Sequence, residues 1–262
     1  MIQAAPPAPL FFSHPTKITR AIARYTTGVL SELLQVLAAA AGGILPALAW
    51  LWFWLREDSR HPEPRQLIAL AFLAGMATVA VVIPIENYVA QYIDSQTALF
   101  TAWSGIEEVC KYLAALATVL WRREDDEPID VVIYMIIVAL GFAAAENALF
   151  LLSPLAGHTV AQTIITGNLR FIGATLLHVL SSAVVGVVIS LSFYSSKIDK
   201  FYHVVSGVIL AMLLHSLFNF FILNEPEESV LRTFGFVWLG VIALLAVLEY
   251  IKRIKPRKIY VQ

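Results

Sequence analysis

The sequence predicts an all-α integral membrane protein, a polytopic helical bundle with about seven transmembrane helices. The chain has 262 residues, of which 59% are hydrophobic and 14% charged, and its mean hydropathy is +0.75. Soluble domains carry about 25% charged and about 45–50% apolar residues. Apolar stretches of about 20 residues, the length that crosses the hydrocarbon core of a bilayer, recur along the chain.

Seven apolar segments separated by links are the candidate spans. The links "REDSRHPEPR", "WRREDDEPID" and "SSKIDK" are short and polar or proline-bearing, which is typical of turns between antiparallel helices. The longer link "SPLAGHTVAQTIITG" is expected to form a surface or re-entrant segment. The predicted spans are Ser31–Leu55, Gln66–Val89, Thr97–Trp121, Ile129–Leu152, Asn168–Phe193, Phe201–Leu223 and Val230–Ile251.

Three regions follow from this division. Residues 1–30 are expected to be an amphipathic or flexible N-terminal segment, with a basic amphipathic helix around "KITRAIARY". Residues 31–252 form the membrane domain, and residues 253–262 form a basic tail. A four-helix core of the membrane domain is expected at about residues 97–223.

Lysine and arginine residues gather on one side of the predicted bundle, which orients it. We expect this side to be cytoplasmic and the membrane to be the plasma (inner) membrane, so the C-terminus lies in the cytoplasm. The N-terminus would then lie outside although it is basic, which leaves its topology open. The basic residues on the cytoplasmic side are Arg56, Arg60, Arg65, Arg122, Arg123, Lys197, Lys200, Lys252, Arg253, Lys255, Arg257 and Lys258.

The charge balance and the single cysteine narrow the function further. A net charge of −1 argues against nucleic acid as a partner. Cys110 is the one cysteine of the chain, so no intramolecular disulfide forms.

Four of the predicted spans carry polar side chains that a lipid-facing helix would not carry. They should face the interior of the bundle, because an unpaired polar group in hydrocarbon costs several kcal/mol. In chain order they are Glu107, Glu108 and Lys111 of the third span, Glu146 and Asn147 of the fourth, Arg170, His178, Ser181 and Ser182 of the fifth, and His215 and Asn219 of the sixth.

Four of these side chains are predicted to lie at one depth in the membrane. Because consecutive spans alternate in direction, Glu107, Glu146, His178 and His215 all fall roughly 9–16 Å below the outer face at 1.5 Å rise per residue. The sequence therefore predicts a single polar site in the outer half of the bilayer.

Spacing within each helix supports such a site. Lys111 is an i, i+4 neighbour of Glu107 and can partly neutralise its carboxylate. Glu107 and Glu108 are about 100° apart around the helix axis, so one of them faces the reaction centre and the other a supporting partner. Ser182 shares a face with His178 and supports it.

Carboxylates and imidazoles that lie together inside an apolar helical bundle can catalyse hydrolysis. A buried glutamate can act as a general base on water, and histidine can polarise a carbonyl or bind a metal. Two histidines and one glutamate with an open position are a common catalytic zinc set. The chain contains no HExxH or GxSxG motif and no phosphate-binding loop.

The motifs "EEVCK", "GFAAAEN", "HVLSS" and "HSLFN", in this order and each on its own span, resemble those of the PrsW family of membrane proteases. That family is related to the CAAX prenyl endopeptidases and to bacteriocin-processing membrane proteases, and the resemblance covers about residues 100–222. It implies that Glu107 and Glu108 are the paired essential glutamates. It also implies that His178 and His215 are the essential histidines.

The resemblance extends to Glu146, which follows Phe142 by four residues as in the PrsW branch. The extra carboxylate implies a metal set of Glu146, His178 and His215 with a divalent ion, zinc being the metal that such ligands favour. A metal-free mechanism, in which glutamate alone activates water, stays open.

The family is similar to site-one proteases that cut membrane-anchored anti-sigma factors on their outer side, so the expected partners are a membrane-anchored protein substrate and the lipid bilayer. The oligomeric state is left open.

The expected roles follow from these observations. Glu107 or Glu108 activates water, Glu146 is a metal ligand or a proton carrier, and Asn219 positions the substrate carbonyl or His215. The expected supporting residues are Lys111, Asn147, Ser182 and Arg170.

Two other functions use the same layer of polar groups. A proton- or cation-coupled transporter or channel also carries intramembrane glutamates and histidines. A non-catalytic scaffold would need an incomplete site, whereas all four motifs are intact.

In the second span, "IPIENYV" repeats the Glu-Asn pair, and there an interfacial cap with Tyr88 in the aromatic belt is the favoured interpretation of Glu86 and Asn87.

Overall fold

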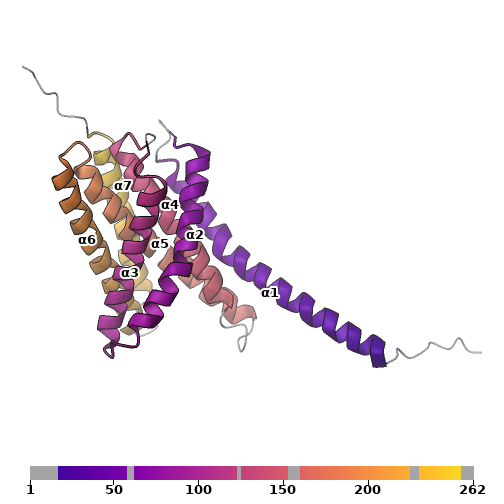
Figure 1. Cartoon of the computed structure of the whole chain (residues 1–262). Helices are drawn as coiled ribbons and strands as arrows, with labels where there is room; N and C mark the ends of the chain where they lie inside the picture. Colours follow the sequence, from indigo (N-terminus) through magenta and orange to yellow (C-terminus); the bar gives the residue numbers. More distant parts are fainter. Residues whose placement is uncertain (1–16, 58–61, 123–124, 153–159, 225–229, 255–262) are drawn as a thin grey trace, which may run out of the picture. The chain divides into compact units, whose positions relative to one another are not determined.

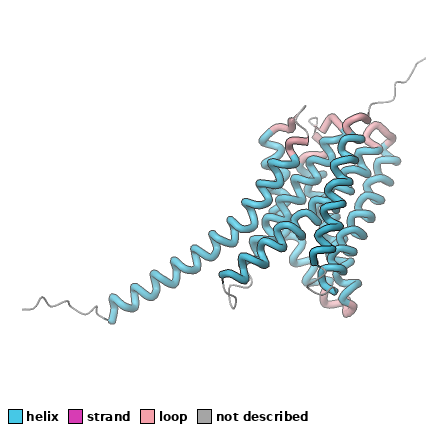
Figure 2. Tube along the Cα trace, turned by 180° about the vertical axis from the view of Figure 1, so that it is seen from behind, coloured by secondary structure: helices cyan, strands magenta, loops and turns pink. Residues whose placement is uncertain are grey.

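The computed structural model describes residues 17–57, 62–122, 125–152, 160–224 and 230–254. This described part contains seven α-helices and no strand, which confirms the all-α prediction (Figure 1). Figure 2 shows loops between helices in pink, and those at residues 90–95 and 192–196 are short. The chain divides into two compact parts, residues 1–38 and residues 39–262, and the site described below lies entirely in the second.

The helices correspond to the seven predicted spans, with differences at their ends. Helix α1 begins before the predicted first span, and α5 begins inside the link that was expected to be a surface or re-entrant segment. Residues 153–159 of that link lie outside the described residues. The helices are α1 (Lys17–Trp54), α2 (Arg65–Val89), α3 (Gln96–Thr118), α4 (Pro128–Leu152), α5 (Val160–Leu191), α6 (Lys197–Asn224) and α7 (Val230–Ile251).

Within the described ranges, five helical segments are long and apolar enough to cross a membrane, and they lie in α1, α2, α4, α5 and α6. Helix α3 is not among them, because the three charges of "EEVCK" interrupt its apolar run. The described apolar stretch of α7 is shorter. Length and composition thus support an integral membrane bundle, in which α3 carries three closely spaced charges, Glu107, Glu108 and Lys111.

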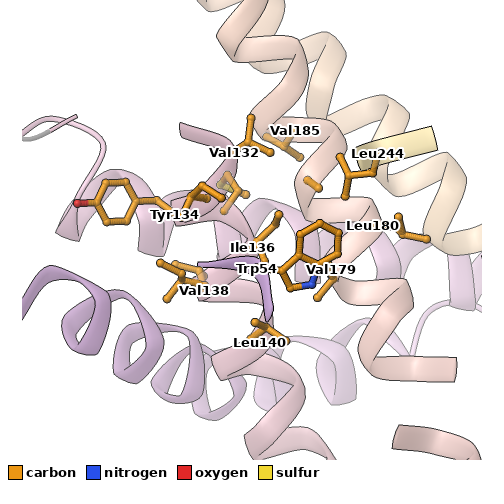
Figure 3. Close-up of a cluster of buried hydrophobic side chains, with 14 of the residues drawn as sticks. Trp54, Val132, Tyr134, Ile136, Val138, Leu140, Val179, Leu180, Val185 and Leu244 are labelled. Atoms are coloured by element: carbon orange, nitrogen blue, oxygen red, sulfur yellow. The ribbon is translucent and has the colours of Figure 1, made fainter. Parts of the chain in front are cut away.

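Helix α4 is the centre of the bundle. Its sequence from Ile129 to Ala144 is apolar on nearly every side, which is the pattern of a helix buried all round. It packs mainly against α2 and α5, and also against α3 and α7. Figure 3 shows Trp54 among side chains of the core cluster that includes Ile136, Val179 and Leu244.

Glycines let α4 approach its neighbours closely. A Cβ at Gly75 of α2 would overlap Val138 O of α4, and a Cβ at Gly141 of α4 would overlap Phe72 O of α2. A Cβ at Gly186 of α5 would lie 2.6 Å from Val132 Cα. Small residues at such crossings are typical of membrane helix packing. These contacts fix the neighbours of α4 and thereby the walls of the site.

Candidate active site

Helix α3 supplies three charged side chains to the interior of the bundle. It begins after Ser95, whose hydroxyl accepts a hydrogen bond from Ala98 N as an N-cap. Glu107, Glu108 and Lys111 are all buried, and Glu108 and Lys111 are fully so. A charge within an apolar bundle is costly unless it is paired, so their partners define the site.

Glu108 is surrounded by donors from three helices. Its Oε1 atom lies 2.7 Å from Lys111 Nζ, 2.9 Å from Ser181 Oγ and 3.0 Å from His215 Nδ1. Its Oε2 atom accepts a hydrogen bond of 2.8 Å from Ser182 Oγ. Both carboxylate oxygens are therefore occupied, and Glu108 ties α3 to α5 and α6.

Glu107 is surrounded differently. Its buried Oε2 atom has no hydrogen-bond partner among the described residues. This oxygen lies 3.5 Å from Lys111 Nζ, 3.6 Å from His178 Nδ1 and 3.9 Å from His215 Nε2. Glu107 thus presents an open acceptor to both histidines.

Each histidine is held by a carboxylate on the nitrogen that points away from Glu107. His178 Nε2 lies 2.8 Å from Glu146 Oε2, and His215 Nδ1 lies 3.0 Å from Glu108 Oε1. A carboxylate only accepts, so a neutral imidazole donates from that nitrogen and keeps its other nitrogen as an acceptor. These carboxylate–histidine pairs thereby direct His178 Nδ1 and His215 Nε2 toward Glu107.

Phe142 of α4 packs the centre of the site. Its ring meets the ring of His178 edge-on at a centroid distance of 5.2 Å, and Lys111 Nζ lies 4.5 Å above it. The two histidine rings are also edge-on, with centroids 5.0 Å apart. Aromatic and cation–π contacts of this kind restrict the orientation of the imidazoles.

The donor set fits a metal ion. Glu107, His178 and His215 each offer one ligand atom, and these three atoms lie within 4.8 Å of one another. Both histidines carry the carboxylate partner on the far nitrogen that is usual for metal-bound imidazole. The set differs from the expected Glu146, His178 and His215, because Glu146 lies against the other nitrogen of His178 and Glu107 completes the group instead.

The other expected residues lie around this centre. Asn219 donates to Ser104 Oγ of α3 at 3.4 Å, and Asn147 donates to Thr175 Oγ1 of α5 at 2.9 Å. Both amides therefore join neighbouring helices. The side chain of Arg170 lies outside the described residues.

The structure also brings residues to the site for which the sequence analysis predicted no catalytic or supporting role. Ser181 contacts Glu108, and Phe142 contacts His178; their signals were the "HVLSS" motif and the four-residue spacing from Phe142 to Glu146. Ser104 and Thr175 are the partners of the two amides, and no pattern in the sequence marked them.

Glu86 of α2, for which the sequence favoured an interfacial cap, also lies within electrostatic range of the site. Its carboxylate interacts electrostatically with Glu146 and Lys111, and its buried Oε1 atom has no hydrogen-bond partner in the described part of the chain. Trp103 Nε1 donates to the backbone oxygen of Glu86 at 3.3 Å, which fixes this turn of α2 beside α3. The repeated Glu-Asn pair was the signal for this position.

The comparisons with known proteins agree on one family. The sequence profile of a family described as "PrsW family intramembrane metalloprotease" matches residues 63–248. The chain is similar to Protease PrsW of Geobacillus kaustophilus, with 26% identity over 71% of this chain and 80% of the relative. It is also similar to Protease PrsW of Clostridioides difficile (25% identity, 74% of this chain, 83% of the relative) and of Bacillus subtilis (24%, 77% and 91%). No solved structure matches the chain.

Proposed function

Because this chain belongs to the PrsW family of intramembrane metalloproteases, we propose that it cuts a membrane-anchored protein at the site formed by Glu107, His178 and His215. The observation that carries the proposal is the buried Oε2 atom of Glu107. This oxygen has no hydrogen-bond partner among the described residues and faces one acceptor nitrogen of each histidine. The family favours this activity over a proton- or cation-coupled transporter, which the same polar groups could serve.

Glu107, His178 and His215 would hold the divalent ion, and zinc suits this set of ligands. When bound, such an ion polarises the scissile carbonyl and activates water. The chain supplies the orientation: Glu108 holds His215 through Nδ1, and Glu146 holds His178 through Nε2. Neither imidazole can turn away without losing a bond to a carboxylate.

Glu146 is the proton carrier in this proposal. Its side chain is 33% exposed, in contrast to 12% for Glu107, so its carboxylate is the more open of the two to water and to an incoming substrate. Its carboxylate accepts the proton of the attacking water and returns it to the nitrogen of the leaving amine. Glu108 has both oxygens occupied by donors and therefore serves to orient His215 and Lys111.

The substrate and the setting are parts of the same proposal. We infer a site-one-protease role on a substrate of the anti-sigma-factor type, cleaved in the outer half of the plasma (inner) membrane. The C-terminus would then lie in the cytoplasm, as the distribution of lysine and arginine predicts.

The test is cleavage by the purified full chain, first in detergent and then in bilayers, of a library of single-span membrane peptides. Mass spectrometry identifies new termini, and a chelator is added to half of the samples. Glu107→Gln should remove every cut. Glu249→Gln, a matched change in an exposed glutamate that pairs with Lys252, should remove none.

Cuts that vanish with the chelator and return with zinc support the metal-dependent form of the proposal. Cuts that survive the chelator but vanish in Glu107→Gln would instead assign Glu107 as the base of a metal-free reaction. If Glu107→Gln cut the same members of the library as the wild type, the proposed site would be wrong.

A further inference from the structure

Three acceptor atoms converge at the centre of the site. They are Glu107 Oε2, His178 Nδ1 and His215 Nε2, and the oxygen lies 3.6 Å and 3.9 Å from the two nitrogens. The nitrogens are acceptors because the opposite nitrogen of each ring faces a carboxylate. Lone pairs that point at one another inside an apolar bundle need a donor or a cation among them.

Lys111 is the cation that the chain itself provides. Its Nζ atom lies 3.0 Å from His178 Nδ1 and 3.5 Å from Glu107 Oε2, and the shortest of these contacts is with Glu108 Oε1 at 2.7 Å. The lysine side chain is fully buried. An ammonium has three donors and no acceptor, so its contact with His178 uses the lone pair of Nδ1.

A metal would use that same lone pair. Metal-bound imidazole is neutral and binds through its unprotonated nitrogen, which in His178 is Nδ1. Glu146 occupies the Nε2 side of the ring, so the ring cannot offer the other nitrogen without breaking that pair. Lys111 and a metal ligated by Glu107, His178 and His215 therefore exclude each other at His178 Nδ1.

We propose that Lys111 is the resident cation of the metal-free site and that metal binding exchanges it for the divalent ion at His178 Nδ1. This inference rests on the proposed function. Lys111 keeps its contact with Glu108 after the exchange, so its side chain needs to leave only His178 and Glu107. The exchange keeps the ligands assembled and the buried carboxylates paired before the metal arrives, at the cost of a weaker apparent metal affinity.

The first test is metal affinity at constant pH, measured by competition with a chelating dye for zinc and from the absorption spectrum for cobalt. Lys111→Met should bind either metal about ten- to a hundredfold more tightly than the wild type, the scale on which residues behind metal ligands act. Lys111→Arg retains the charge and should bind no more tightly than the wild type. Lys252→Met is the matched control, because Lys252 pairs with Glu57 and Glu249 at the surface.

Equal or weaker metal binding by Lys111→Met would overturn the inference, because Lys111 would then assemble the ligands instead of competing with the metal. A second measurement uses the unaltered chain and so does not depend on the folding of the variant. With lysine side chains labelled with ¹⁵N and the Lys111 signal assigned by its loss in Lys111→Arg, zinc should shift that signal strongly. An unchanged signal at saturating zinc would contradict the exchange.

Parallel cleavage assays separate this inference from the protease proposal. Tighter binding by Lys111→Met together with a zinc-loaded wild type that cuts nothing would support the exchange and overturn the protease. Cleavage by the wild type without tighter binding by Lys111→Met would retain the protease and overturn the exchange.

Discussion

Glu107 and Glu108 are adjacent in the sequence, yet their carboxylates have opposite surroundings. Glu108 receives donors from Lys111, Ser181, Ser182 and His215, whereas the buried Oε2 atom of Glu107 has no hydrogen-bond partner among the described residues. The turn of about 100° between successive residues of a helix produces this division. The carboxylate of Glu108 therefore joins α3 to α5 and α6, whereas Glu107 keeps an acceptor atom without a hydrogen bond in the described part of the chain.

Substitution of each glutamate by glutamine should separate these roles. Glu108→Gln replaces an oxygen acceptor by a donor that faces Lys111 or Ser182, so it should lower the free energy of unfolding by about 3 kcal/mol. Glu107→Gln should abolish cleavage with a change in stability of less than about 1 kcal/mol, since no hydrogen bond to Oε2 is lost. Thermal unfolding in detergent and peptide cleavage measure the two effects. A Glu107→Gln variant that cut its substrate at the wild-type rate would contradict the assignment.

Metal removal should distinguish Glu107 from Glu146 as the third ligand. Zinc at a hundred times its dissociation constant stabilises a protein that binds it only when folded by about 2.7 kcal/mol. In Glu107→Gln, zinc should give little of this stabilisation, and the unfolding temperature should rise little when zinc is added. In Glu146→Gln, zinc should still give most of the stabilisation, but cleavage should be lost. The reverse pattern would support the set expected from the sequence, in which Glu146 binds the metal and Glu107 does not.

The sequence could predict the arrangement of helices because apolar length and polar interruption are local properties. The seven helices of the described part, five of them long and apolar enough to span a membrane, match the apolar segments of the sequence. The inward position of the charges of α3 follows from the cost of polar groups in hydrocarbon. The ends of α1 and α5 could not be predicted in the same way. A helix that continues beyond the apolar stretch, as α1 does from Lys17 and α5 does from Val160, leaves no break in periodicity to detect.

The roles within the site could not be assigned from spacing. The four motifs place Glu107, Glu146, His178 and His215 on their helices, but the nitrogen that each imidazole presents depends on contacts between helices. Glu146 occupies His178 Nε2, and the three potential ligand atoms that lie close together belong to Glu107, His178 and His215. Phe142 fixes the same ring from α4, and no pattern in the sequence specifies the angle between them.

Substitution of Glu86 tests whether this residue contributes to cleavage at the expense of folding stability. A carboxylate whose buried oxygen lacks a donor and which lies within the electrostatic range of Glu146 costs folding free energy. Glu86→Gln should raise the free energy of unfolding by about 1 kcal/mol and lower cleavage about tenfold, the trade-off expected of a functional residue. Asn87→Ala changes the exposed neighbouring side chain and should leave cleavage unaltered. A more stable Glu86→Gln variant with full activity would return Glu86 to the role of an interfacial residue.

The crossing of α2 and α4 should tolerate no larger residue. A Cβ at Gly141 would overlap the carbonyl oxygen of Phe72, and a backbone atom cannot move aside as the end of a side chain can. Gly141→Ala should therefore destabilise the bundle by about 3 kcal/mol or more, in the upper range of overpacking. Gly235→Ala is the matched control in α7, because a Cβ there meets no described atom within 4 Å, and alanine should be neutral or slightly stabilising. Equal unfolding temperatures for the two variants would argue against the close approach of α2 and α4.

The link between α3 and α4 contains the group whose titration should affect stability at neutral pH. Burial raises the pKa of Asp125 from 3.8 to about 7, and repulsion by Asp130 and Asp126 adds to this while Lys200 opposes it. Oδ1 of Asp125 is buried without a hydrogen-bond partner in the described part of the chain.

The folded chain therefore binds the proton of Asp125 more tightly than the unfolded chain does. The stability that the bound proton contributes is fully present below about pH 4 and is lost as the pH rises from about 4 to about 7. Asp125→Asn removes this loss. The variant should exceed the wild type in free energy of unfolding by about 1 kcal/mol at pH 8, below the roughly 4 kcal/mol of the full shift because the side chain is only partly buried. Thermal unfolding at pH 4 and pH 8 measures the difference, which should vanish at the lower pH, and an advantage of equal size at both would show that titration of Asp125 is not its cause.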